Sequence, residues 1–103
     1  MRIISRARLR EFWQKHAAMQ VSLENWHQVV KHAQWNKPND IKLTFGNSID
    51  IFSKHNRLVY IFDVGGNNVR VICDVNFGTK IVYILFVLTH SEYSRNKWKD
   101  KLC

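Results

Sequence analysis

Three side chains with the chemistry to act on a phosphodiester lie in two short polar stretches of the C-terminal half of the chain. Arg70 follows the glycine turn Gly65-Gly66, and His90 and Tyr93 follow the next long apolar run. An imidazole transfers protons near neutral pH, a fixed cation stabilises charge that develops on a phosphate, and an aromatic ring stacks on a base. With the RNA 2′-hydroxyl as nucleophile, these groups suffice for strand cleavage without a metal ion.

Each of these residues also has a structural interpretation. Arg70 can be an exposed strand arginine that pairs with Asp63 or Asp74. His90 and Tyr93 can be a histidine at the start of a helix and a half-buried tyrosine. The chemical interpretation is favoured because all three residues fall at one rim of the expected sheet, in a strongly basic chain.

The basic character of the chain is pronounced. It contains 16 lysines and arginines against 8 aspartates and glutamates, which gives a formal net charge of +8. A charge of this size indicates a polyanionic partner, such as nucleic acid, an anionic membrane surface or an acidic protein. The residues that we expect to contact RNA are Lys42, Lys54, Arg57, Asn67, Lys80, Arg95 and Lys97.

Length and composition limit the remaining classes of function. A chain of 103 residues is expected to form one domain, residues 1–103. The five histidines are scattered and there is no CxxC pair, so we expect neither a metal site nor a cofactor. Cys73 is expected to be buried and Cys103 to be an exposed tail thiol, which suits a reducing cytoplasm. No apolar run approaches about 18 residues, so no membrane span is expected.

Alternating apolar residues predict the strands that carry the three polar groups. The alternation runs over 57–64 and again over 69–77, which is typical of antiparallel strands with one buried face. The segment 80–89 is apolar almost throughout and is expected to be a central strand. Gly65-Gly66 and Gly78-Thr79 are expected to be two-residue hairpin turns, the second of type II′.

Two-residue turns predict the register of this antiparallel sheet. They place Ile61 opposite Arg70, Arg70 opposite Val87, and Arg57 opposite Asp74. The residues then expected to face the helices are Val69, Val71, Tyr60, Phe62, Val82, Ile84 and Phe86. The residues expected on the opposite, open face are Arg57, Arg70, Asp74, Tyr83 and Leu85. A slip of one residue would bury Arg70 and Asp74 in the core.

The N-terminal half is expected to supply the helices that support the sheet. A short β-prone piece at 2–4 precedes a helix over 6–18 that Ser5 would cap. A second helix, over 23–36, would be capped by Ser22. Apolar residues recur at helical spacing in both segments. The two helices are expected to form an antiparallel hairpin packed on the sheet.

Histidines and the C-terminal segment complete the expected structure. His16 lies on the apolar stripe of the first helix and is expected to be partly buried, whereas His27 and His32 are expected to be exposed. After the last strand, Ser91 is expected to cap a short helix that runs to Lys99.

Two runs of this sequence resemble a known protein family. They are Phe62-Asp63-Val64-Gly65-Gly66-Asn67-Asn68-Val69-Arg70-Val71 and Phe86-Val87-Leu88-Thr89-His90-Ser91-Glu92-Tyr93. With the element order β-α-α-β-β-β and a short C-terminal helix, they look like the HigB-type toxins of bacterial toxin–antitoxin pairs, which have the RelE-like α+β fold. The resemblance covers nearly the whole chain. It is most specific from Asn56 to Tyr93, where G-G-N-x-x-R and T-H-x-E-Y stand at the separation seen in that family.

The resemblance implies a function and a set of roles. Members of the family cleave mRNA, typically on the translating ribosome, and are neutralised by a helix-turn-helix antitoxin encoded beside them. Carried over to this chain, Arg70 would stabilise the transition state, His90 would transfer protons and Tyr93 would position the RNA. The reaction would need no cofactor or metal ion, and it would take place in the cytoplasm.

One position departs from the family pattern. The family commonly has an arginine in a motif of the form I-R-F-V-x-T-H, where this chain has Leu85. The expected register puts Leu85 on the same face as Arg70, so one cation of the expected site is missing. Two alternatives to an active endoribonuclease therefore stay open. One is a weak or inactive module of the same fold that binds RNA and the ribosome, and the other is a general basic RNA-binding domain that does not need His90.

Overall fold

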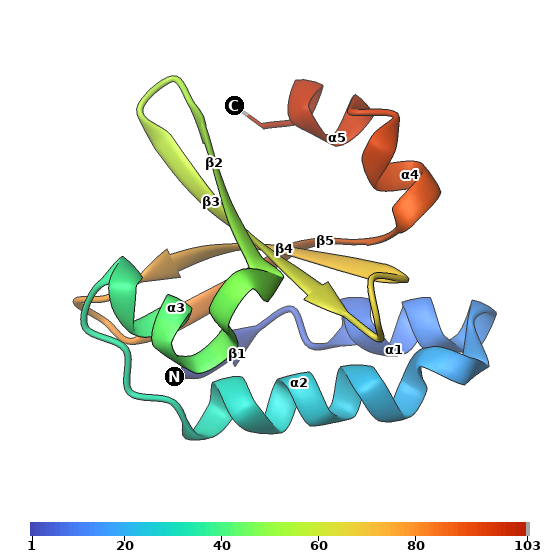
Figure 1. Ribbon diagram of the computed structural model, residues 1–103, viewed down its shortest axis with the longest axis horizontal. Coiled ribbons are helices and arrows are strands. Elements are labelled where there is room, and N and C mark those ends of the chain that lie inside the picture. Colours follow the sequence, from blue (N-terminus) through green and yellow to red (C-terminus); the bar gives the residue numbers. More distant parts are fainter. Residues whose placement is uncertain (103) are drawn as a thin grey trace.

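The computed structural model describes residues 1–102, which form an α+β fold in layers (Figure 1). The predicted tail thiol Cys103 lies outside these residues. The strands are β1 (Arg2–Ile4), β2 (Ile49–Lys54), β3 (Arg57–Val64), β4 (Val69–Asn76) and β5 (Ile81–Thr89). The helices are α1 (Ala7–Lys15), α2 (Gln20–His32), α3 (Pro38–Phe45), α4 (His90–Ser94) and α5 (Lys97–Asp100), with 3₁₀ turns at Ala17–Met19 and Gly46–Ser48. The α+β class expected from the sequence is confirmed.

One five-stranded sheet organises the fold, with the strand order β1-β5-β4-β3-β2. The neighbours from β2 to β5 are antiparallel, as the alternating pattern predicts. The short β1 pairs in parallel with the beginning of β5, where Ile3 lies opposite Val82. Apolar clusters cover β5 on both of its faces, which explains why this strand is apolar almost throughout.

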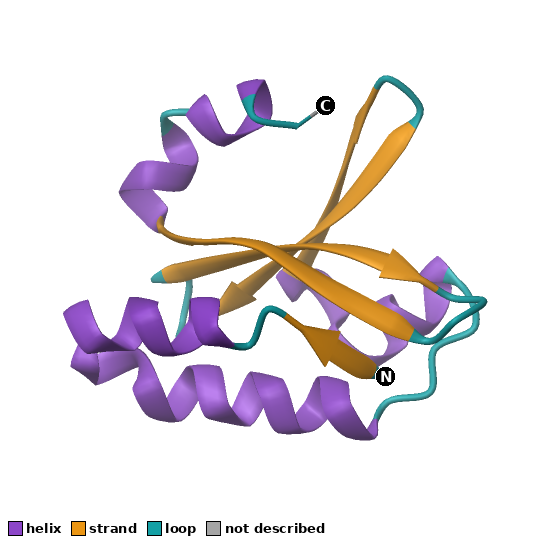
Figure 2. Ribbon diagram, turned by 180° about the vertical axis from the view of Figure 1, so that it is seen from behind, coloured by secondary structure: helices purple, strands orange, loops and turns teal. Residues whose placement is uncertain are grey.

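The helices α1, α2 and α3 cover one face of the sheet, the lower face in Figure 1, and Figure 2 shows the same layer from behind. Aromatic rings fill the centre of this core. The ring of Phe62 lies 5.3 Å from Trp26, 6.3 Å from Trp35 and 5.1 Å from Phe45, measured between centroids. The fully buried aliphatic residues around them include Leu9, Leu23, Val30, Ile41, Val71 and Val82. Each such side chain contributes about 1.5–3 kcal/mol through burial, so this layer anchors the sheet.

The opposite face of the sheet carries a second apolar cluster. Val59, Ile61 and Ile72 are buried there together with Trp98 and Leu102 from the C-terminal segment. The sequence analysis expected this face to be open, and that expectation is wrong next to α5. The C-terminal segment is basic in composition, but the indole of Trp98 is 3% exposed and holds the segment against the sheet.

The hairpin between β3 and β4 is wider than predicted. Asp63, and not Ile61, lies opposite Arg70, and the loop consists of the four residues 65–68. The first three residues of this loop have positive φ angles of 64°, 63° and 79°, whereas a two-residue turn accommodates only two left-handed residues. Because the register differs from the predicted one by two positions, every side chain still lies on its predicted face.

The turn between β4 and β5 differs from the predicted type II′ turn. Four residues, 77–80, separate the two strands, and the positive φ of 60° belongs to Lys80 rather than to Gly78. The side-chain oxygen of Asn76 accepts a hydrogen bond from the backbone N–H of Thr79 at 3.0 Å. An asparagine that bonds its own turn in this way replaces the glycine as the residue that shapes it.

A β-bulge divides the pairing of β4 with β5. At Leu85, which has no partner in β4, the register shifts by one residue. Beyond the bulge Arg70 lies opposite Leu88, where the sequence predicted Val87, and Phe86 packs on the second cluster instead of facing the helices. One extra residue reverses the face of each residue that follows it. The sequence does not indicate this bulge, because β5 is apolar on both faces and shows no alternation that a shift in register would interrupt.

Helix starts also differ from the predicted ones. Ser5 does not cap α1, since its own φ is 71° and the helix begins at Ala7. Ser22 lies inside α2, which begins at Gln20. Pro38 stands in the first turn of α3, where its missing N–H costs nothing.

The end of α2 takes part in a contact that the sequence does not reveal. The ammonium group of Met1 donates hydrogen bonds to the carbonyl oxygens of Val30, Lys31 and Ala33 at 3.3, 3.2 and 2.5 Å. A cation is favourable at the C-terminus of a helix, where carbonyl groups lack partners. The helix ends at His32, before the predicted residue 36.

Two histidines lie in environments other than those predicted. His27 was expected to be exposed but is 8% exposed. His16 was expected to be partly buried but is exposed, with its ring stacked on Phe12 at 4.4 Å. His32 is exposed, as predicted. The buried stripe of α2 consists of Leu23, Trp26, His27 and Val30. This spacing of i, i+3, i+4 and i+7 was the signal that places His27 inside.

Candidate active site

Arg70 is held at the start of β4 by β3 and by the loop between these strands. Its Nε lies 2.8 Å from Oδ1 of Asp63, its Nη1 donates to the carbonyl oxygen of Asn67 at 3.0 Å, and its Nη2 contacts the Asn67 side-chain oxygen. The whole residue is 6% exposed. The alternative in which Arg70 pairs with Asp63 is thus observed, but the arginine is buried rather than exposed. These contacts fix the plane of the guanidinium.

The outer edge of this guanidinium faces His90. Nη2 of Arg70 lies 3.2 Å from Nδ1 of His90. Because an arginine can only donate, the contact is a hydrogen bond only when Nδ1 carries the lone pair. The imidazole proton then resides on Nε2, and Nε2 is the ring nitrogen left for a substrate.

The backbone around His90 is fixed by a capping box at the start of α4. The backbone N–H of Glu92 donates to Oγ1 of Thr89 at 3.1 Å, and the backbone N–H of Thr89 donates to Oε1 of Glu92 at 3.0 Å. The backbone N–H of His90 donates to the carbonyl oxygen of Asn68 at 3.1 Å. Thr89, and not the predicted Ser91, is therefore the cap, and the sequence T-x-x-E was the signal for it.

Tyr93 lies between Arg70 and Trp98. The Cζ atom of Arg70 lies 5.2 Å from the centroid of the Tyr93 ring, and the Trp98 ring stacks on that ring at 5.5 Å. Burial raises the pKa of Tyr93, Asp50 raises it further, and Arg70 opposes the change. The phenol therefore stays protonated at neutral pH and can donate a hydrogen bond. The structure thus brings together the three residues that the sequence analysis grouped.

Asp63 is the carboxylate that pairs with Arg70. Burial raises its pKa, and this effect outweighs the attraction of Arg70, which lowers the pKa. Asp50 also raises the pKa of Asp63, and His90 lowers it. Placing the ionised carboxylate in the site therefore costs desolvation energy. Its role there is to orient the guanidinium of Arg70.

Residues 19–96, which include Arg70, His90 and Tyr93, match the model of a protein family. The family is described as the HigB toxin, the RelE-like toxic component of a toxin–antitoxin system. The chain belongs to the HigB toxin family.

Curated relatives of similar length support this assignment. The mRNA interferase HigB of Escherichia coli O6:H1 is 34% identical over 95 residues, which cover 92% of this chain and 90% of that protein. The mRNA interferase toxin HigB of Escherichia coli K12 and the mRNA interferase HigB of Shigella flexneri are each 32% identical over 96 residues, which cover 90% of this chain and 88% of theirs. The family and the RelE-like α+β fold expected from the sequence are confirmed.

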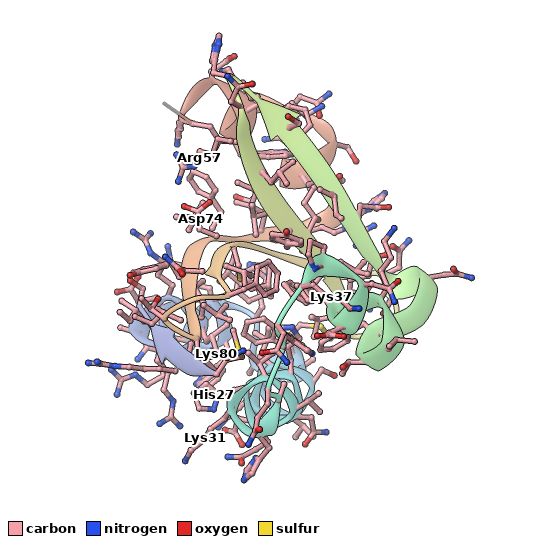
Figure 3. The ribbon with its side chains drawn as sticks, turned by 90° about the vertical axis from the view of Figure 1, so that its left-hand side faces the viewer. His27, Lys31, Lys37, Arg57, Asp74 and Lys80 are labelled. Carbon is pink, nitrogen blue, oxygen red and sulfur yellow. The ribbon has the colours of Figure 1, made fainter. Side chains whose placement is uncertain are left out.

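Four of the residues predicted to bind RNA in this HigB-family chain contact groups of the protein itself. Lys54 donates to a backbone carbonyl of α5 at 2.6 Å, and Lys80 donates to a backbone carbonyl that follows α2 at 2.8 Å. Nη2 of Arg57 lies 2.5 Å from Oδ2 of Asp74, and Figure 3 shows this pair on one side of the molecule. Asn67 contacts the guanidinium described above.

The other three predicted RNA-binding residues do not share one surface. Lys42, Arg95 and Lys97 are all exposed. Lys42 lies on α3, whereas Arg95 and Lys97 lie at the junction of α4 and α5, on the other side of the sheet (Figure 1). The structure therefore does not gather the predicted RNA-binding residues into a single patch.

A groove of about 260 Å³ between α1 and the end of β5 contains polar residues that the sequence analysis missed. Arg8, Lys15 and His16 line it, together with apolar residues of β5 and with Glu92 of α4. Arg8 and Lys15 are seven positions apart and therefore lie on one side of α1, which was the available signal. The groove brings these cations next to the helix that carries His90.

Residues 1–102 were also searched for groups of metal ligands and for membrane-spanning helices. No three or more histidine, cysteine, aspartate or glutamate side chains among them are grouped as metal ligands would be. No helix among them combines the length and the apolar character needed to cross a membrane.

Cys73 is fully buried, as predicted, and burial raises the pKa of its thiol well above the ordinary value. Cys73 is therefore a residue of the hydrophobic core.

Proposed function

We propose that this HigB-family chain is an endoribonuclease that cleaves mRNA at Arg70, His90 and Tyr93. The observation that carries the proposal is the 3.2 Å contact between Nη2 of Arg70 and Nδ1 of His90, beside the ring of Tyr93. The names of the curated relatives, all mRNA interferases, support the choice of substrate.

The proposed reaction uses the RNA itself as the nucleophile. The 2′-oxygen attacks the adjacent phosphorus and loses its proton, the bond from phosphorus to the 5′-oxygen breaks, and the 5′-oxygen takes up a proton. The products are a 2′,3′-cyclic phosphate and a 5′-hydroxyl. His90 faces the RNA with Nε2, because Nδ1 faces Arg70. In the tautomer with the ring proton on Nδ1, which gives up the hydrogen bond from Arg70, Nε2 accepts the proton of the 2′-hydroxyl. The imidazolium so formed then returns a proton from Nε2 to the 5′-oxygen. No water has to be activated, so this chemistry requires no metal ion.

Arg70 and Tyr93 provide charge and position. The guanidinium places positive charge beside His90, where it favours the negative charge that develops on the phosphorane. Because Arg70 is enclosed and its Nη2 contacts both Asn67 and His90, it acts through its charge and by holding the imidazole. Tyr93 offers a protonated hydroxyl and a ring already supported by Trp98, which suits the positioning of a nucleotide.

Membership of the family supports a proposal for the cellular setting. A toxic component of a toxin–antitoxin system has an antitoxin partner. We extend the proposal to an antitoxin of the helix-turn-helix type, to mRNA cleavage on the translating ribosome, and to action in the cytoplasm, where that mRNA is found.

The test compares the wild type with His90→Ala and with His32→Ala, which removes an exposed histidine of α2. Growth after induction is recorded, and cut sites are mapped on ribosome-bound mRNA. The expected loss of cleavage in His90→Ala is about 10²–10⁴-fold, the usual contribution of acid–base catalysis. His32→Ala should cleave normally. A fully toxic His90→Ala protein would remove the histidine from the chemistry.

A second function is favoured by the enclosure of Arg70. Asp63 and Asn67 occupy most of its donors, and its side chain is 7% exposed. The chain would then bind RNA and antitoxin but cleave slowly. Binding and cleavage of ribosome-associated mRNA distinguish this second function from the endoribonuclease. If the second function is correct, the wild-type protein binds this mRNA but cleaves it no faster than His90→Ala does.

A further inference from the structure

A basic cavity lies at the end of the sheet opposite the candidate active site. It has a volume of about 660 Å³ and opens between β1, α2 and the turn that joins β4 to β5. Its polar lining consists of Arg2, Arg6, His27, Lys31, Thr79 and Lys80. Figure 3 shows His27, Lys31 and Lys80 along one side of the molecule. None of the residues that line the cavity is acidic.

Four cations around one opening repel one another. Arg2, Arg6 and Lys31 are exposed, where water keeps this repulsion small, and Lys80 is half-buried. Burial is the largest cause that lowers the pKa of His27, and the charges of Arg6 and Lys31 lower that pKa further. A cluster of like charges without a carboxylate in its lining is stabilised when an anion occupies it.

His27 is the feature that makes this cluster more than a solvated basic surface. The residue is 8% exposed, and it lines the cavity. Its ring nitrogens are not among the buried side-chain atoms of residues 1–102 that lack a hydrogen-bond partner. The ring is therefore open to the cavity, and a ligand there can accept a hydrogen bond from it.

From this arrangement we infer that the cavity binds a phosphate group of RNA, at a point on the RNA away from the cleaved bond. The inference rests on the proposed function for the choice of RNA. Guanidinium, ammonium, imidazole and hydroxyl groups are all donors to phosphate oxygens. An acidic peptide fits less well because only Met1 and Ile3 of the lining are apolar, and peptide anchors bury apolar side chains.

The place of the cavity in the fold defines what it contributes. The strand β5 runs from Ile81 beside the cavity to Thr89 beside the candidate active site. At about 3.3 Å per residue, the two sites are about 25 Å apart. The cavity therefore holds a phosphate remote from the reaction, and it contributes affinity and register without touching the reacting atoms.

The test measures binding of a 2′-O-methyl RNA oligonucleotide, which lacks the nucleophile and cannot be cut by the proposed reaction. Arg6→Gln/Lys31→Gln is compared with Arg10→Gln/Lys37→Gln, which has the same net charge and removes exposed cations outside the lining. Loss of one phosphate contact lowers the salt slope by about 0.7, which means about fivefold weaker binding near 0.1 M salt. The cavity variant should show at least this loss, and the control should show less than half of it.

A second arm uses His27→Gln, which keeps the net charge at neutral pH. A phosphate bound at the cavity favours the imidazolium, so wild-type binding should strengthen as pH falls from 7.5 to 5.5, and His27→Gln should lose the part of that gain that His27 supplies. The charged groups near His27 are Arg6, Lys31 and, on its other side, Glu24. The ammonium of Met1 also lines the cavity, and burial and Lys80 lower its pKa. Because His27→Gln keeps this ammonium, the difference between the two proteins isolates the imidazole.

Three outcomes would overturn the inference. One is equal binding by the cavity variant and its control, and another is an unchanged pH response in His27→Gln. The third is competition by an acidic peptide as strong as that by an oligonucleotide of equal charge, which would assign the cavity to a protein partner. Failure of the proposed function is recognised separately, because wild-type protein would then bind the oligonucleotide but not cleave ribosome-bound mRNA.

Discussion

Nη2 of Arg70 lies 3.2 Å from Nδ1 of His90, while Nε of the same guanidinium lies 2.8 Å from Oδ1 of Asp63. One buried side chain thus connects a carboxylate of β3 to the imidazole at the start of α4. The connection holds together two segments that the chain separates by the whole of β4 and β5. The predictions below follow from this arrangement and from the apolar clusters on either side of it.

Arg70→Lys should lose cleavage while keeping the net charge. A lysine has a single ammonium and cannot bond Asp63, Asn67 and His90 in one plane. The expected loss in cleavage is about 10–100-fold, and loss of charged hydrogen bonds should lower the free energy of unfolding by about 1.5–3 kcal/mol. Cleavage of ribosome-bound mRNA and urea unfolding measure the two effects. Wild-type cleavage in Arg70→Lys would show that charge alone is sufficient.

Asp63→Asn should release Arg70 toward RNA. The carboxamide keeps the shape but removes the charge that pairs with the guanidinium. Stability should fall by about 1–3 kcal/mol, less than the about 3–5 kcal/mol for a fully buried pair, because the Asp63 side chain is 25% exposed. Affinity for a non-cleavable RNA should rise at the same time. Unchanged affinity in a folded Asp63→Asn protein would show that Arg70 is not reached by the RNA.

Tyr93→Phe and Tyr93→Ala separate the ring from the hydroxyl. Phenylalanine keeps the stack on Trp98 and the contact with the Arg70 guanidinium, whereas alanine removes both. If the ring positions a base, Tyr93→Phe should cleave within about threefold of wild type and Tyr93→Ala should lose about 1–3 kcal/mol of RNA binding. Equal loss of cleavage in both variants would assign the role to the hydroxyl. Near-wild-type unfolding of Tyr93→Phe serves as the control.

Leu85→Arg should raise cleavage, because the resemblance given in the sequence analysis implies an arginine at this position. Leu85 sits at the bulge, three positions before Leu88, the residue opposite Arg70. The added cation would therefore stand about 10 Å along the strand from Arg70. We expect a gain of about tenfold, below the 10²–10³-fold that a donor in direct contact supplies. Leu85→Met, which keeps the packing on the second cluster, is the control, and no gain in a folded Leu85→Arg protein would contradict the prediction.

His27 should make the protein less stable at acidic pH. Its pKa in the folded state is lowered first by burial and then by Arg6 and Lys31, so the unfolded chain binds more protons once the pH falls below about 6.5. Stability is retained above that pH and is lost below it, by at most about 1.4 kcal/mol per pH unit. In urea unfolding between pH 7.5 and 5.5, His27→Gln should lose less stability than the wild type. An identical pH dependence would mean that another group controls it.

The amino-acid sequence by itself determined the class of the fold and the three residues of the candidate site. Period-two alternation predicted β3 without error and assigned Tyr60, Phe62 and Val71 to the face under the helices, because a strand with one buried face must alternate. A glycine-rich loop and a polar run after an apolar strand predicted that Arg70, His90 and Tyr93 lie at one rim of the sheet. These signals are local, so they survive errors in turn geometry.

Only the tertiary structure decided how those residues are held and what surrounds them. The burial of Arg70 depends on Asp63 and the wide loop, the position of Leu85 depends on a bulge in a strand that is apolar on both faces, and the cover over the second face depends on Trp98. The basic cavity around His27 joins residues of several segments that are distant in the chain. Pairing between distant segments is set by loop geometry and by competition for buried area. A local pattern records neither of these quantities.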